Sequence, residues 1–161
     1  MAPKANTPLQ PNYWMFSANE QSEEWENFYN EGIMAVGHDG TGDLNNYNSK
    51  QEMQEAIDAH FNDRKRHFQH ALCNWQFCNE MNIGDIIFVK RGRHYLIGYG
   101  IVKSNYRYDE TQKDFRHIRD VEWLANTEIH TYSDLGMKTL TKLKEEEKIG
   151  EMCGLLNIER G

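Results

Sequence analysis

Two apolar runs separated by a three-residue turn constrain the fold more than any other feature of the sequence. The runs are "DIIFVK" (85–90) and "HYLIGYGIV" (94–102), with Arg91, Gly92 and Arg93 between them. Apolar, β-branched and aromatic runs joined by a short loop that contains glycine predict an antiparallel hairpin. Gly98 and Gly100 fall inside the second run, and glycine in a strand interior indicates a bulge, a corner or a close backbone approach. We therefore expect a strongly curved sheet.

Other strand and helix patterns surround this hairpin. Strands are predicted at 13–19, 32–37 and 119–125, with one more at 128–132. Helices are predicted at 20–31, from Ser49 through Phe61, from Phe68 to about Asn82, and over much of 133–161; Ser49 with Glu52 matches a capping box. The predicted fold class is therefore α+β, with a curved, mostly antiparallel, barrel-like sheet flanked by helices.

Length and composition predict one intracellular domain. The first twelve of the 161 residues hold all three prolines and little that is apolar, so we expect a flexible leader at 1–12. A single domain then spans 13–161, with a helical insertion around 49–80. The sequence lacks an apolar run long enough for a membrane span, and its three cysteines are typical of reduced thiols, so we expect a cytoplasmic protein.

Motifs of the common enzyme classes are missing from the sequence. It contains no phosphate-binding GxxxxGK[ST] loop, no GxGxxG, no HExxH and no GxSxG. The loop "HDGTGDL" offers His38, Asp39 and Asp43 for acid/base chemistry, but turns are the more common use of such loops. A histidine and cysteine group at His60, His67, His70, Cys73 and Cys78 lacks the paired spacing of structural zinc sites. We accordingly predict a binding domain that is not an enzyme, with no cofactor and no metal.

Charge and rings gather between Lys90 and Arg119. This window holds eight basic and three acidic residues, although the whole chain carries a net charge of −7. Tyr106, Tyr108 and Phe115 lie in the connection between two predicted strands, among the basic side chains. Rings beside guanidinium groups are typical of surfaces that stack an unpaired base while cations hold its phosphates. Ordinary sheet-edge tyrosines and outward-facing charges are the alternative interpretation.

The order of these motifs resembles a known family. "YWMFSAN", a Trp-bearing helix, "EGIMAVGHDGTGDL", a helical insertion, "GDIIFVKRG", "IGYGIV" and "HIRDVEWL" together resemble the EVE domain of the PUA-like superfamily, a relative of the YTH domains. The chain is most similar to the modified-base-reading domain of McrB-type restriction proteins. This resemblance covers about 13–124.

The resemblance implies a pocket that receives a flipped, methylated or otherwise modified base of DNA. Its implied base-binding residues are Ser17, Asn19, His38, Asp43, Tyr106, Tyr108, Phe115 and Trp123. Its implied phosphate-binding residues are Lys90, Arg91, Arg93, Lys103, Arg107, Arg116 and Arg119. His38 departs from the family pattern, which often has tryptophan there. The implied partners are modified DNA, with RNA as an alternative, and a GTPase motor segment and restriction nuclease subunit supplied elsewhere.

Two other function classes stay open from the sequence. A small nucleic-acid-processing enzyme would use His38, Asp39 and Asp43. A protein interaction module would use the exposed rings to contact a partner chain.

Overall fold

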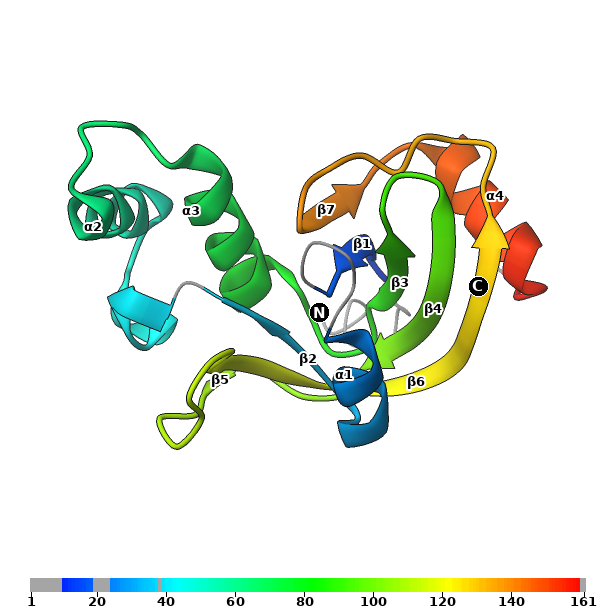
Figure 1. Cartoon of the computed structure of the whole chain (residues 1–161), viewed down its shortest axis with the longest axis horizontal. Coiled ribbons are helices and arrows are strands. Elements are labelled where there is room, and N and C mark those ends of the chain that lie inside the picture. The colour runs from blue at the N-terminus through cyan, green and yellow to red at the C-terminus, as the bar shows by residue number, and fades with distance from the viewer. Residues whose placement is uncertain (1–9, 19–23, 38, 160–161) are drawn as a thin grey trace, which may run out of the picture.

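A curled sheet with helices packed against it and at one end forms the molecule (Figure 1). The structure is a computed structural model, and it describes residues 10–18, 24–37 and 39–159. The strands are β1 (Tyr13–Ser17), β2 (Ile33–Val36), β3 (Ile86–Arg91), β4 (Tyr95–Val102), β5 (Arg107–Tyr108), β6 (His117–His130) and β7 (Leu140–Leu143). The α-helices are α1 (Trp25–Glu31), α2 (Lys50–Phe61), α3 (Phe68–Trp75) and α4 (Glu146–Leu156), with short 3₁₀ helices at Asp39–Thr41 and Leu44–Asn46 and a short π-helix at Gln76–Glu80. The predicted α+β class is confirmed.

The strand order is β2-β6-β4-β3-β1-β7, with β5 also paired to β6. All pairs are antiparallel except β1 with β3. β4 and β6 curve together around β3 and β1, while α2 and α3 stand at one end of the sheet (Figure 1). The order places β2 and β7 at the two ends of the sheet.

Alternation along the strands divides the core between the two faces of the sheet. Trp14 and Phe16 on β1 join the larger cluster inside the curl, which also includes Trp25 and Phe28 of α1. Met15, between them, faces the other way and packs with a second cluster that includes residues of α4. Successive side chains of a strand point to opposite faces, so a fully buried strand is apolar throughout.

Glycines in β4 allow the predicted curvature. A Cβ built on Gly98 would lie 2.4 Å from Cζ2 of Trp25, and one on Gly100 would lie 2.6 Å from Cε3 of Trp123. The register between β4 and β6 shifts between Leu96 and Gly98 and again between Tyr99 and Gly100. The rings of Trp25 and Trp123 thus lie against β4 at positions where any other residue would place a side chain.

Several local predictions are wrong. Residues 133–145 are not helical, because 140–143 form β7 and complete the edge of β1. The two strands predicted at 119–125 and 128–132 are one long strand, β6, and β5 was not predicted. Asn12, assigned to a flexible leader, donates its backbone N–H to Oδ1 of Asp85 at 3.0 Å. The cap at Ser49 is confirmed, since its hydroxyl accepts the Glu52 N–H at 3.1 Å.

Candidate functional site

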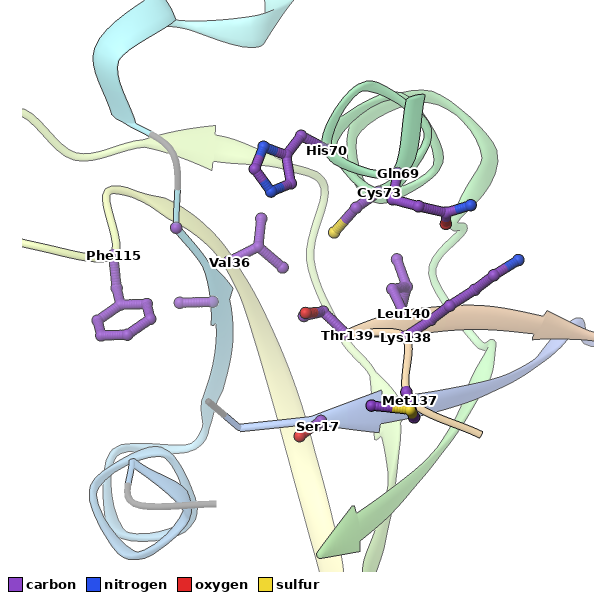
Figure 2. Close-up of a pocket in the computed structure, with 12 residues that line it drawn as sticks. Ser17, Val36, Gln69, His70, Cys73, Phe115, Met137, Lys138, Thr139 and Leu140 are labelled. Atoms are coloured by element: carbon purple, nitrogen blue, oxygen red, sulfur yellow. The ribbon is translucent and has the colours of Figure 1, made fainter. Parts of the chain in front are cut away.

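A pocket of about 520 Å³ opens between the two ends of the sheet. The end of β1, the end of β2, one face of α3 and the segment before β7 surround it (Figure 2). Its lining residues are Ser17, Ala35, Val36, Gly37, Gln69, His70, Cys73, Phe115, Met137, Lys138, Thr139 and Leu140. Two residues predicted for a base-binding pocket, Ser17 and Phe115, are therefore brought together here.

Phe115 provides the aromatic wall of the pocket. Its backbone has φ +56°, a left-handed conformation that is uncommon for a bulky residue and costs free energy. The ring packs edge-on against Phe28, with centroids 5.6 Å apart and an interplanar angle of 84°. Among the described lining residues it is the one phenyl or indole ring. The ring thus lies at the pocket with Phe28 packed against it (Figure 2).

The α3 wall is uncharged at neutral pH. Burial, with a smaller contribution from the nearby charge of His67, lowers the pKa of His70 below its ordinary value. Burial also raises the pKa of the Cys73 thiol to about 12, so this side chain stays protonated. An imidazole, a thiol and the amide of Gln69 can therefore face a neutral heterocycle without a net charge.

The third wall is a segment that we call the strap, Asp134–Thr139, which leads into β7. The backbone N–H of Ser17 donates to the carbonyl of Thr139 at 2.9 Å, so the end of β1 and the end of the strap are fixed to each other. Met137 is 82% exposed, and Lys138 is also exposed. Within the part of the chain that the structure describes, no ion pair is seen for Lys138. This lysine is the cation that lies at the pocket itself.

The predicted tyrosines do not reach the pocket. Tyr106 is 8% exposed. Its hydroxyl lies 2.7 Å from Nδ1 of His117 and accepts the Leu44 N–H at 3.1 Å. Tyr108 is half-buried on β5 and contacts the same His117 ring. These rings belong to the core, and α3 takes the place that was predicted for them.

Two other predicted base-binding residues have structural contacts. The indole N–H of Trp123 donates to the carbonyls of Ile33 at 3.0 Å and Phe28 at 3.2 Å. The carboxylate of Asp43 accepts the Asn45 N–H at 2.9 Å and caps the 3₁₀ turn at Leu44–Asn46. Asn19 and His38 lie outside the described residues.

The predicted phosphate-binding set contains two buried cations. Arg119 is 2% exposed, and its guanidinium donates to four backbone carbonyls, those of Phe77, Ser104, Cys78 and Met81. Lys90 is also 2% exposed and donates to the carbonyls of Leu135 and Gly136. Backbone oxygens already satisfy these two side chains, which removes them from the set that can contact phosphate.

Carboxylates pair with four more of the predicted cations. The ion pairs are Arg91–Glu128, Arg93–Asp134, Lys103–Glu122 and Arg107–Asp120. Arg116 is half-buried and donates to the carbonyl of Gln112 at 2.8 Å. The window that is basic in sequence is thus largely neutralised in space, mainly by acidic residues from outside it.

Sequence reasoning missed most of the pocket lining. The spacing of His70 and Cys73 predicts one shared helical face, but in the sequence it indicates only a candidate metal site. The strap is not predicted because the leucine spacing over 135–143 indicates a helix.

Among the described residues there is no group of three His, Cys, Asp or Glu side chains that could hold a metal ion. Nor does any helix in the described ranges have the length and apolar character needed to cross a bilayer.

The fold has solved counterparts. The YTH domain of the Zygosaccharomyces rouxii MRB1 protein in complex with N6-methyladenosine RNA is 10% identical, with a TM-score of 0.53 over 96% of this chain and 94% of that one. The MmI1 YTH domain is 10% identical, with a TM-score of 0.50 over 91% and 95%. The YTH domain-containing protein mmi1, solved with RNA, is 11% identical, with a TM-score of 0.50 over 92% and 82%. No curated protein matches the sequence.

These likenesses define the class of the protein by its fold alone: the chain has the curled α+β fold of the solved YTH domains. By sequence, the chain belongs to the family described as "Domain of unknown function (DUF8426)", whose model matches residues 14–144. The match begins in β1 and ends after β7, so it includes every strand and both edges of the pocket.

Proposed function

We propose that this chain is a binding module that reads a modified base, most simply a methylated one, after the base has left the helical stack. The observation that carries the proposal is the pocket between β2 and β7, where Ser17 and Phe115 meet the uncharged face of α3. Its volume of about 520 Å³ lies in the range of sites that enclose small organic ligands. The YTH fold of a domain solved with N6-methyladenosine RNA supports the same function.

The pocket supplies what a flipped base needs. Removing a base from the stack costs a few kcal/mol, and stacking on a protein ring returns about 1–3 kcal/mol. Phe115 offers that ring, while Ser17, Gln69 and His70 offer donors and acceptors for the base edge. A buried methyl group adds about 0.8 kcal/mol, roughly a fourfold preference, so close contact with Val36 and Leu140 must supply additional discrimination.

The finer proposal concerns the nucleic acid and the partners. The motif order that resembles McrB-type proteins favours modified DNA as the ligand, with a GTPase motor and a restriction nuclease subunit as the machinery that the module directs. RNA is the second candidate, favoured by the solved counterparts that carry RNA. In either case Lys138 contacts a phosphate near the flipped nucleotide and positions it without reading sequence.

Binding to matched oligonucleotides tests the proposal. Single-stranded DNA and RNA of one sequence, each with adenine, N6-methyladenine, cytosine or 5-methylcytosine at one position, are titrated by fluorescence anisotropy. We expect one modified oligonucleotide to bind at least about fivefold more tightly than its plain twin. Ser17→Ala and Phe115→Ala should remove that difference. Phe68→Ala, which changes an exposed ring outside the pocket lining, should preserve it. Equal affinity for every modified and plain strand would reject the proposal.

A further inference from the structure

A buried lysine holds the strap at the edge of the pocket. The Nζ of Lys90, on β3, donates to the carbonyl of Gly136 at 2.5 Å and to that of Leu135 at 3.3 Å. These two carbonyls immediately precede Met137 and Lys138, which are exposed and line the pocket. Lys90 therefore acts on the strap just before the residues that face a ligand.

Other contacts fix the same part of the strap. The Leu135 N–H donates to the Arg93 carbonyl at 2.7 Å. The Gly136 N–H donates to Oδ1 of Asp134 at 2.8 Å, and Asp134 is ion-paired with Arg93. At the far end, the Ser17 N–H holds the Thr139 carbonyl. Met137 and Lys138 thus form the short exposed portion between two anchored ends.

The strand register connects both anchors. Ser17 and Lys90 are partners in the parallel pairing of β1 with β3. Ser17, which lines the pocket, and Lys90, which holds the strap, therefore lie side by side on neighbouring strands. From this placement we infer that Lys90 is a positioning residue: its ammonium group sets the strap at the distance from β1 that a base in the pocket requires.

The choice of lysine at this site points to function more than to stability. Burying an ammonium group costs free energy even where it is hydrogen-bonded, and an apolar side chain of similar size often serves a core equally well or better. Burial lowers the pKa of Lys90 to about 8. The charged groups that face it are Asp134 on the strap, which raises this pKa, and Lys148 of α4 and Arg93 of the β3–β4 turn, which lower it.

The charge state of Lys90 affects the strap and the whole fold in the same direction wherever the opening exposes Lys90 to water. Above about pH 8 the neutral amine still donates hydrogen bonds, but weaker ones than the charged group. Because the folded pKa lies below that of an unfolded lysine, global stability gained from Lys90 rises between about pH 8 and 10.5. A strap that becomes better protected as global stability rises, and only where Lys90 is present, is therefore the signature of this device.

Hydrogen exchange tests the anchor without any ligand. We expect Lys90→Met to lower the protection factors of the Leu135 and Gly136 amides by at least about fivefold, since charge-assisted bonds are lost. In the wild-type protein these factors, corrected for intrinsic exchange, should rise from pH 7 to pH 9, because an opening that exposes Lys90 to water becomes less favourable once the buried amine has lost its proton. The control is Lys103→Met, which removes an exposed lysine paired with Glu122 and should leave them unchanged. Unchanged protection in Lys90→Met, or a wild-type strap insensitive to pH over this interval, would overturn the anchor.

Binding then tests the effect on the pocket, which rests on the function proposed above. The probe is the modified oligonucleotide that the wild-type chain prefers, titrated at pH 7 and pH 9. We expect Lys90→Met to weaken binding about fivefold or more at pH 7 and to remove the pH dependence seen in the wild type. If Lys90→Met binds the probe as the wild type does, Lys90 does not position the pocket. If the wild type prefers no probe while exchange responds as expected, the proposed function fails and the anchor stands.

Discussion

At the scale of single residues, Phe115 combines backbone strain with a place in the pocket. A non-glycine residue in the left-handed region costs about 1–2 kcal/mol, and glycine adopts this region without that cost. We predict that Phe115→Ala and Phe115→Gly weaken modified-base binding equally, because both remove the ring. The glycine variant should nevertheless unfold at higher denaturant concentration than the alanine variant, by about 1 kcal/mol in free energy.

Chemical denaturation of the two variants beside the binding titration measures both effects. A glycine variant less stable than the alanine variant would show that the φ of +56° carries no strain. Retained binding in both variants would remove Phe115 from the site. Comparing the two variants thus separates two effects: the contact of the Phe115 ring with a ligand and the free-energy cost of the strained backbone.

At the scale of elements, two glycines that look alike in sequence have opposite roles. Gly98 in β4 lies against the Trp25 ring, where an added Cβ would stand 2.4 Å from Cζ2 and 3.1 Å from the Ala125 carbonyl oxygen. Gly150 lies within α4, with nothing within 4 Å of an added Cβ. We predict that Gly98→Ala lowers the free energy of unfolding by about 1–3 kcal/mol because of overpacking. Gly150→Ala should raise it by about 0.5–1 kcal/mol, since alanine favours a helix. Thermal melts decide between these signs, and a stabilising Gly98→Ala would contradict the close approach of the ring.

How far the sequence predicts an element depends on where its partners come from. The β3–β4 hairpin and the Ser49 cap are governed by neighbours in the chain, and both were predicted. β7 pairs with β1, more than 120 residues away, and its leucine spacing also fits a helix, so local pattern alone gave the wrong structure. The same reason applies to the pocket: local composition and motif order point to Ser17 and Phe115, whose part in binding stays a prediction. His70 and the strap enter the pocket only through the curl of the sheet.

At the scale of the whole molecule, ion pairs with carboxylates neutralise much of the positive charge of the segment 90–119. Exposed pairs contribute about 0–1 kcal/mol each, so a phosphate can compete for Arg91 or Lys103 only at a small cost. The chain as a whole carries a net charge of −7, which opposes the approach of any polyanion. On the proposed function, we therefore expect a ligand held mainly by its base, with few phosphate contacts.

The salt dependence of binding tests this balance directly. For single strands the logarithm of the affinity falls with the logarithm of salt concentration with a slope of roughly −0.7 for each phosphate contact. With Lys138 and one or two released surface cations as contacts, we predict a slope between about −1.4 and −2.1 for the preferred modified strand. The modified and plain strands should share this slope, because the modification alters contacts in the pocket and leaves the phosphates alone.

Lys138→Met should make the slope shallower by about 0.7, while Lys50→Met, which changes an exposed lysine at the start of α2, should leave it unchanged. A slope steeper than about −4 would mean that the paired cations release their carboxylates together on binding. In that case the phosphate chain, and not the flipped base, would dominate recognition.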